Sequence, residues 1–252
     1  FISADTNYDT LWKKILLNLL GCIPFSKNNF DYKAIKQILN YLKQGYPVGI
    51  YPEGGRNWTG ETDEVIYSTA KLIKLAKVPV YTTLNKGGYL SKPRWSQYYK
   101  KGVFEIEITK TLNINEIENL DIDEVFKKIK SSMYHNDYKW QRKNMIKFKG
   151  NKRAEHIERV LYVCPQCCAL DSFTSENNHF YCKNCGSKHE VNEYGFIIGN
   201  SNYDNVVDWD KWQRKKLEEF SDSEDFYLES KEVYMQKFSD NNKEYNGLTN
   251  II

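Results

Sequence analysis

The sequence has no apolar run long enough to cross a membrane. The longest candidate, Ile15 to Phe25, is interrupted by Asn18 and Pro24 and is shorter than the roughly 20 residues that a spanning helix needs. The first residues, FISADTNY, have no basic stretch followed by a long apolar stretch, so they do not resemble a signal peptide. We therefore expect no membrane span, and a chain that begins inside a longer protein.

Neither sign of charge is in large excess. The 252 residues include 36 Lys and Arg against 33 Asp and Glu, which leaves a formal net charge of +3. Proteins that bind nucleic acid usually carry a dense basic face, and here acidic residues such as those between Glu218 and Glu232 offset the basic ones. We therefore do not expect nucleic acid as a partner. The length allows one or two globular domains with a substantial core.

Cysteine is almost missing outside one short stretch. Five of the six cysteines lie between Cys164 and Cys185, and four of them form two Cys-x-x-Cys pairs with 14 residues between the pairs. This spacing is typical of a zinc ribbon, in which four thiolates close a tetrahedral site that stabilises the fold. We predict a structural zinc in a reducing compartment, with these ligands: Cys164, Cys167, Cys182 and Cys185.

Two histidines near the ribbon are the alternative ligands. His179 and His189 lie close enough to be considered, but four cysteines in paired spacing outweigh them. Cys168 is adjacent to a predicted ligand and must point elsewhere. Because the ribbon has no dense basic face, we expect it to stabilise the chain or to bind a protein partner rather than nucleic acid.

Helical and strand-like segments alternate in the first half of the chain. Apolar residues have helical spacing over Thr10 to Leu20, Asp31 to Gln44 and Asp63 to Lys77. Strand-like runs follow at residues 47–51 and 78–84, and residues 103–108 alternate as a half-buried strand does. This order predicts an α/β domain with a mostly parallel sheet flanked by helices, followed by a small β zinc ribbon.

Four regions are expected from these patterns. A core is followed by a helical connector with helices near Asp121 to Met133 and Asp137 to Phe148, then by the ribbon, then by a polar tail with one helix at Asp208 to Phe220. We interpret the tail as a candidate for the start of a further domain. The expected boundaries are 1–113 for the core, 114–160 for the connector, 161–199 for the ribbon and 200–252 for the tail.

One glycine-rich segment, YPEGGRNWTGE from Tyr51 to Glu61, follows a strand-like run. Its glycines let the backbone approach a ligand closely, and Arg56 presents five donors that suit a phosphate or a carboxylate. Ligands collect at such strand-to-helix connections in parallel sheets. No Gly-Lys-Ser/Thr follows, so the segment does not fit the phosphate-loop template. On these residues alone, an anion site and a tight structural turn are equally open.

The order Pro52-Glu53-Gly54-Gly55-Arg56 resembles the Pro-Glu-Gly-Thr-Arg block of the glycerolipid acyltransferases of the lysophosphatidate type. Upstream, GCIPFSK (Gly21 to Lys27) resembles the second block of that family, and downstream Val78-Pro79-Val80 resembles its fourth block. The phrases KPRW, YKWQRKNM and LYVCPQC are similar to those of a clostridial-type subset in which a four-cysteine ribbon follows the acyltransferase core. The resemblance then extends to about Trp212.

The resemblance implies transfer of a fatty acyl group from a thioester of acyl carrier protein or coenzyme A to the hydroxyl of a lysophospholipid. The enzyme type would be a 1-acylglycerol-3-phosphate O-acyltransferase of phospholipid biosynthesis. Arg56 would bind the acceptor phosphate and Pro79 would border the acyl site. Lys27 replaces the usual arginine and Gly55 the usual threonine, and Lys27 can also be read as a surface lysine. The implied substrate-binding residues are Lys27, Glu53, Gly54, Gly55, Arg56 and Pro79.

The catalytic pair of that family, His-x4-Asp, is missing from the sequence. The residues five positions after the four histidines are Trp140, Leu161, Asn184 and Tyr194. In the family the pair precedes the second block, so we expect this chain to lack its amino-terminal motif and to be inactive alone. The alternative is a non-catalytic acyltransferase-like scaffold that uses the ribbon to bind a protein.

Cations and aromatic rings are mixed in KPRWSQYYKK, from Lys92 to Lys101. Such a segment suits the headgroup region of an anionic membrane, and it is equally typical of a solvent-exposed loop. Because a lysophospholipid would itself lie in a bilayer, we favour the membrane interpretation. We expect a cytoplasmic protein that is peripheral at the membrane surface.

Overall fold

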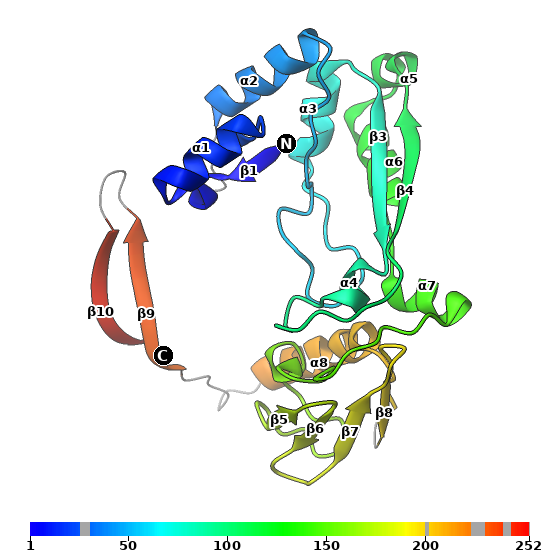
Figure 1. Cartoon of the computed structure of the whole chain (residues 1–252), viewed down its shortest axis with the longest axis vertical. Helices are drawn as coiled ribbons and strands as arrows, with labels where there is room; N and C mark the ends of the chain where they lie inside the picture. Colours follow the sequence, from blue (N-terminus) through cyan, green and yellow to red (C-terminus); the bar gives the residue numbers. More distant parts are fainter. Residues whose placement is uncertain (26–30, 200–201, 223–229, 239–242, 252) are drawn as a thin grey trace.

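The computed structural model describes residues 1–25, 31–199, 202–222, 230–238 and 243–251. It is a mixed α/β structure with several small sheets, which confirms the expected fold class. Figure 1 shows an amino-terminal part, a central strand pair with its helices, and the ribbon below them. None of the helices in the described residues is long and apolar enough to cross a membrane.

The amino-terminal part is built on a parallel strand pair. β1 (Ile2–Ala4) pairs with β2 (Ile23–Phe25), and α1 (Leu11–Leu19) lies between them in sequence. α2 (Tyr32–Lys43) packs its apolar face on β2, and its Asp31 cap accepts a hydrogen bond from the Ala34 amide at 2.9 Å. The strand-like run at 47–51 forms no strand, although the Ile2 amide donates to the Gly49 carbonyl at 3.0 Å.

The central pair is antiparallel rather than parallel. β3 (Val80–Lys86) pairs with β4 (Glu105–Leu112), because the connection, which includes α4 (Gly88–Ser91), stays at one end of the pair instead of crossing over it. The half-burial predicted for residues 103–108 is wrong. Ile106 and Ile108 are 56% and 67% exposed, because the helices cover the opposite face of the pair.

Three helices cover that opposite face. α3 (Ser68–Ala76) and α6 (Ile122–Met133) pack on it with α5 (Ile114–Asn119), and their apolar residues form one core cluster with Leu112. α5 and α6 both begin with capping boxes, in which the cap side chain and the third helical residue satisfy each other's amides. α3 starts later than predicted, because the Ile66 amide donates to the Pro52 carbonyl at 2.8 Å and holds the preceding residues extended.

The last part combines the ribbon with a helix. Four antiparallel strands, in the order β5-β6-β7-β8, form the ribbon, and α8 (Val206–Ser221) packs against them through Trp209. Gln213 of α8 is fully buried, accepts from the Tyr162 amide at 2.9 Å and donates to the Val160 carbonyl at 2.7 Å. The strand bounds are Phe173–Glu176, His179–Cys182, Lys188–Val191 and Ile197–Gly199.

Two further elements complete the chain. α7 (Asp137–Asn144) connects the central part to the ribbon and ends earlier than the predicted residue 148, because Met145 adopts a left-handed conformation with φ of 49°. Beyond α8, β9 (Ser230–Phe238) and β10 (Lys243–Ile251) form an antiparallel pair.

His189 of β7 is buried among aromatic rings. Its ring stacks on Phe180 with centroids 4.8 Å apart and meets Trp209 edge-on at 5.3 Å, and neither ring nitrogen has a hydrogen-bond partner among the residues that the structure describes. Burial disfavours the imidazolium and lowers the pKa of His189 from 6.5 to about 4. His189 is therefore a neutral core residue of the ribbon and not a metal ligand.

The buried imidazole should make the ribbon sensitive to acid. Because the unfolded chain binds a proton near pH 6.5 and the folded chain only near pH 4, the free energy of unfolding should fall as the pH drops through this range, by about 1–3 kcal/mol. His189→Phe keeps the ring and cannot bind the proton. Denaturant unfolding at pH 7 and pH 5 should show a smaller loss for His189→Phe than for the wild type, and equal losses would contradict the assignment.

Candidate functional site

A large cavity lies between the amino-terminal part, the glycine-rich segment and β3. Its volume is about 790 Å³, and its walls include Phe1, apolar residues of α2, residues 47–53 and 55–57, and most of β3. Polar and apolar side chains both face it. It is large enough for a ligand that has a charged group and an alkyl chain.

The glycine-rich segment forms one wall of this cavity, and much of that wall is backbone rather than side chain. The Gly54 amide donates to the Tyr51 carbonyl at 3.0 Å in a tight turn, in which Gly54 has φ of +70°. At the other end, the Asn57 side chain accepts from the Gly60 amide at 3.0 Å. Gly60 has φ of +95°, and a Cβ there would lie 2.5 Å from the Tyr89 ring. A glycine is therefore required at Gly60 by conformation and by packing.

Three cations of this region line the cavity: Arg56, Lys92 and Arg94. The Arg56 guanidinium donates through Nη2 to the Lys92 carbonyl at 3.1 Å. The Arg94 side chain donates to the Arg56 carbonyl, and its guanidinium lies 4.3 Å from the centroid of the Trp58 ring. These contacts hold both guanidinium groups at the cavity wall. Neither forms a salt bridge with a described acidic residue, although the charge of Arg94 acts on the nearby Asp63 carboxyl, so both can still bind an anion.

Glu53 ties the segment to the residues that follow it. Its Oε2 accepts from the Asp63 amide at 2.9 Å. Burial raises the pKa of the Glu53 carboxyl and that of the Asp63 carboxyl. Negative charge on either group is therefore less favourable here than in water. Glu53 therefore shapes the wall next to Arg56.

The cavity brings together most of the residues that the sequence assigned to substrate binding. Glu53, Gly55, Arg56 and Pro79 all line it. Gly54 forms the turn behind them and is not part of the lining. Lys27 lies outside the described residues.

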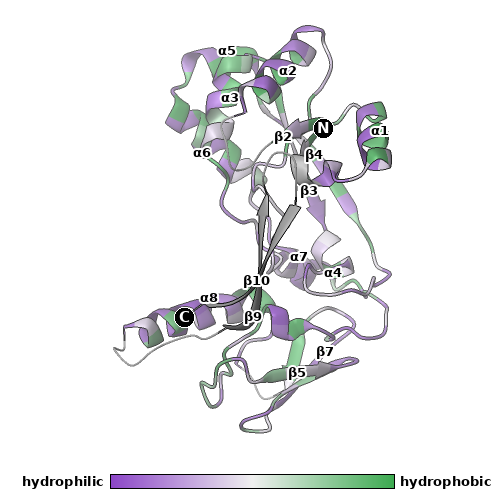
Figure 2. Ribbon diagram, turned by 90° about the vertical axis from the view of Figure 1, so that its left-hand side faces the viewer, coloured by the Kyte–Doolittle hydropathy of each residue, from purple (hydrophilic) through white to green (hydrophobic). Residues whose placement is uncertain are grey.

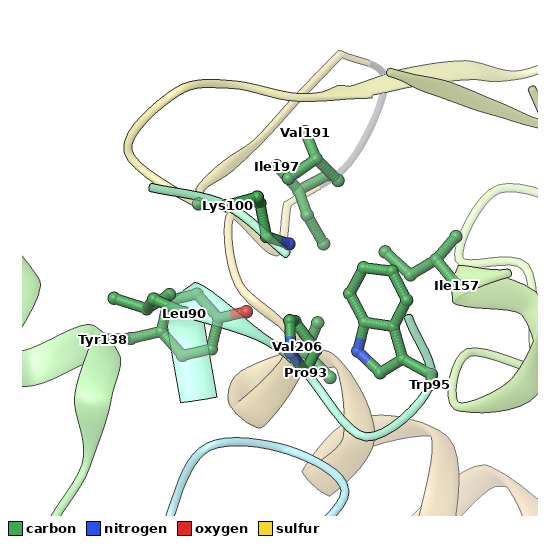
Figure 3. Close-up of a pocket in the computed structure, with 10 residues that line it drawn as sticks. Leu90, Pro93, Trp95, Lys100, Tyr138, Ile157, Val191, Ile197 and Val206 are labelled. Atoms are coloured by element: carbon green, nitrogen blue, oxygen red, sulfur yellow. The ribbon is translucent and has the colours of Figure 1, made fainter. Parts of the chain in front are cut away.

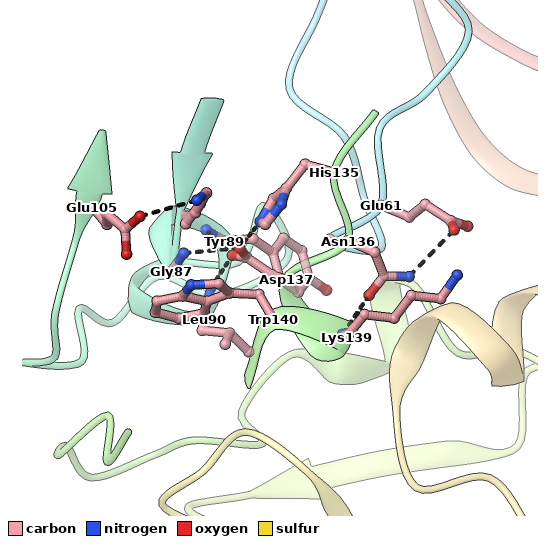
Figure 4. A network of polar contacts seen from close by, with 12 residues as sticks. Glu61, Gly87, Tyr89, Leu90, Glu105, His135, Asn136, Asp137, Lys139 and Trp140 are labelled. Atoms are coloured by element: carbon pink, nitrogen blue, oxygen red, sulfur yellow. Dashed lines mark hydrogen bonds and ion pairs between the residues drawn. The ribbon is translucent and has the colours of Figure 1, made fainter. Parts of the chain in front are cut away.

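A histidine–aspartate pair that the sequence analysis missed also lines the cavity. His135 Nε2 lies 2.7 Å from Asp137 Oδ1, and the carboxylate accepts backbone amides from the start of α4 (Figure 4). The search for His-x4-Asp could not find it, because only one residue separates the two side chains. A search for any histidine within a few residues of an aspartate would have found it.

The KPRWSQYYKK segment is more buried than a membrane-facing loop. Trp95 is buried and donates through Nε1 to the Tyr89 hydroxyl at 2.9 Å. Lys100 is 5% exposed beside a small cavity of about 10 Å³ (Figure 3), where burial and then Arg153 lower its pKa to about 7. The membrane interpretation is therefore wrong for these two side chains, which pack between α4 and the ribbon.

The four predicted cysteine ligands lie together and could hold a metal ion. Their sulfur atoms are all within 4.8 Å of one another, and Cys164 and Cys185, like Cys167 and Cys182, are 3.7 Å apart. The Ser172 hydroxyl lies 3.1 Å from the Cys182 sulfur, in reach to support a thiolate. Cys168 is exposed and not part of the cluster. Four sulfur ligands suit a closed zinc site of structural type.

Metal binding should depend on the cluster and not on the neighbouring thiol. Cys182→Ser removes one ligand, so we expect it to abolish the binding of one zinc per chain and to unfold the ribbon. Zinc stoichiometry and the fluorescence of Trp209, which packs on Phe173 and Phe180, measure the two effects. Cys168→Ser is the matched control and should keep both. A Cys182→Ser variant with full zinc content would contradict the ligand set.

Comparison with known proteins gives one match. Residues 1–85 match the family model described as acyltransferase. This match covers the second block, the glycine-rich segment and β3 as far as Asn85, and it supports acyl transfer as the general function. No curated protein and no solved structure matches the chain.

Proposed function

We propose that this chain is the acceptor-binding part of an acyltransferase that acts on a lysophospholipid such as 1-acylglycerol-3-phosphate, in phospholipid biosynthesis. The match over residues 1–85 supports acyl transfer in general. The finer assignment rests on one observation, which is that Arg56 lines the same cavity as a set of apolar side chains. The phosphate of a lysophospholipid would bind Arg56, and its alkyl chain would pack against the apolar side chains.

The cations favour an acceptor with a phosphate. Arg56, Lys92 and Arg94 come from two segments and converge on one wall. A guanidinium can bind two phosphate oxygens at once, which fixes the orientation of the ligand as well as its position. Glu53 and Gly55 lie beside Arg56 and would set the shape of this pocket.

The apolar lining favours an acyl chain. Ile38 and Leu42 of α2, Val48 and Leu72 face the same cavity as Pro79. Burial of each methylene of a chain against such side chains stabilises the complex by about 0.8 kcal/mol. The donor of the acyl group in this proposal is a thioester of acyl carrier protein or of coenzyme A.

An apolar helix face supports peripheral contact with a membrane. No residue of α1 is buried, and Leu11, Trp12 and Leu19 are among its most exposed side chains. Figure 2 shows α1 at the edge of the molecule, with hydrophobic residues in green beside hydrophilic residues in purple. Lys13 and Lys14 flank the apolar face. A short helix with a tryptophan on its apolar face and lysines beside it suits the interface of a bilayer on the cytoplasmic side.

A second candidate function is a non-catalytic scaffold, which the missing His-x4-Asp pair favours. In that case the ribbon would bind a protein partner and the cavity would bind a lipid without turnover. In either case we expect the zinc to be structural, because four cysteines leave no open position for a reacting group.

Replacement of Arg56 tests the acceptor site by binding alone. Arg56→Ala removes the charged donors, so we expect the Kd for 1-acylglycerol-3-phosphate to rise about 10- to 100-fold, and Arg56→Lys to give an intermediate value. Equilibrium binding with a fluorescent acceptor measures both. The control is Lys128→Ala, which removes a cation of α6 that is paired with Glu116 of α5. An unchanged Kd for Arg56→Ala would remove the phosphate assignment.

A charge on the exposed face of α1 tests the membrane contact. Leu19 is 80% exposed, so Leu19→Glu should not affect folding but should weaken binding to vesicles that contain phosphatidylglycerol. Co-sedimentation with vesicles and the emission maximum of Trp12 report this binding. Leu75→Glu, at a residue of α3 that is 60% exposed, is the matched control. Equal vesicle binding by both variants would exclude α1 as the contact.

A further inference from the structure

Lys100 has a buried amine at the junction between the segment that follows β3 and the ribbon. Only 5% of the residue is exposed, and its side chain lines a cavity of about 10 Å³, which has room for about one water molecule. Leu90 and Trp95 of that segment line the cavity together with Val191 of β7 and Val206 of α8. Figure 3 shows the amine nitrogen among these side chains.

The amine has no acidic partner at this junction. Among the described residues, no carboxylate forms an ion pair or a hydrogen bond with it, and its nitrogen lies 5.3 Å from the centroid of the Trp95 ring. The charge that acts on it is that of the Arg153 guanidinium, which has the same sign, donates to the Val191 carbonyl at 2.8 Å and lies 3.3 Å from the Glu190 carboxylate. From α7 the cavity is lined by Tyr138, and burial raises the pKa of this phenol, so it is neutral at pH 7. The other residues of the lining do not titrate.

The side chain of Lys100 is held in place along its length. Its amide donates to the Ser91 carbonyl at 2.8 Å, and its carbonyl accepts from the Ser91 hydroxyl at 2.9 Å. A Cβ on Gly150 would lie only 3.1 Å from Cγ of Lys100, so the stem is tightly packed. The amine can therefore reach bulk water only if the junction opens.

A neutral amine and a charged ammonium differ sharply in such a place. An ammonium loses its hydration in an apolar site, and here no carboxylate compensates for that loss. Burial, followed by the charge of Arg153, lowers the pKa of Lys100 from 10.5 to about 7. The closed junction therefore favours the neutral amine.

We propose that Lys100 makes this junction sensitive to pH: the junction is closed around the neutral amine and opens when the amine binds a proton. The inference does not depend on the proposed acyl transfer. Trp95 donates to the Tyr89 hydroxyl, which donates to the Trp58 carbonyl, so an open junction should also loosen the glycine-rich wall of the large cavity.

The direction of the effect follows from proton linkage. When the junction is open, the amine lies in water and has its ordinary pKa of 10.5, whereas in the closed junction the pKa is about 7. Between these values the open state binds more protons, so the closed state gains stability as the pH rises and loses it as the pH falls. The contribution of Lys100 to the ratio of open to closed junctions should fall about 10-fold from pH 6 to pH 8.

Hydrogen exchange of the zinc-loaded 252-residue chain tests this inference at pH 6 and pH 8. The reporting amides are those of Lys101, which donates to the Lys149 carbonyl at 2.7 Å, and of Phe148, which donates to the Glu193 carbonyl at 2.7 Å. Lys100→Met keeps the length of the side chain and cannot bind the proton. Because both proteins share the zinc site and His189, the ratio of their protection factors isolates position 100. We expect this ratio, wild type over variant, to rise about 10-fold from pH 6 to pH 8.

The matched control is Lys101→Met, at an exposed neighbouring lysine, which should follow the wild type at both pH values. A ratio for Lys100→Met that does not change with pH would overturn the inference. Titration of the wild type by NMR with ¹³C-labelled lysine gives a second measurement that does not require the variant to fold. The Lys100 amine should titrate near pH 7, and a midpoint at the ordinary 10.5 would equally overturn the inference.

Discussion

The buried carboxylate of Asp137 is the contact on which the candidate site depends. It joins three segments that are far apart in sequence: the glycine-rich segment through Gly60, the turn after β3 through Gly87 and Tyr89, and the start of α7, where Asp137 itself lies. Burial of a carboxylate without hydrogen-bond donors would destabilise the fold, and removal of one donor would leave the charge of Asp137 less well compensated. One polar centre therefore joins three segments of the cavity wall, in addition to the contacts that Glu53 and Arg56 make within it.

The ribbon supports this wall from the other side. Trp95 donates to the Tyr89 hydroxyl, which donates to the Trp58 carbonyl at 3.0 Å, so the glycine-rich segment rests on a residue that packs on the ribbon. Gln141 of α7 donates to the Tyr194 carbonyl at 2.9 Å, which fixes α7 on the ribbon. The contacts of Trp95 and Gln141 therefore connect the stability of the ribbon to the order of the cavity wall, although no described residue of the ribbon strands lines the cavity.

The sequence predicts those features that depend on local residues. Paired cysteines identify the four-cysteine cluster, apolar residues at helical spacing identify α2 and α6, and the order of the blocks leads to the segment around Arg56. It does not predict features that depend on tertiary contacts. The alternation in β4 predicts burial of its apolar face only if a second layer covers that face, and Ile106 and Ile108 are instead 56% and 67% exposed. Trp95 lies in a basic segment and would be expected to be exposed, but it is buried in the core that the ribbon residues form. The His135–Asp137 pair could not be assigned, because its meaning comes from the amides of α4, some 50 residues earlier in the chain.

Gly55 and Gly60 of the glycine-rich segment lack a side chain for two different reasons. At Gly55 the added Cβ would meet only the end of the Arg94 side chain, at 3.9 Å, so the absence of a side chain leaves space toward the cavity. At Gly60 a Cβ would meet the Tyr89 ring, and the Gly60 carbonyl accepts the Asp137 amide. One glycine therefore leaves room for a ligand, whereas the other lets the segment approach the polar centre that orients His135. Close backbone approach at Gly60 places Arg56, the proposed phosphate ligand, and the histidine–aspartate pair in one wall, so a substitution there should disturb both at once, although neither side chain is altered.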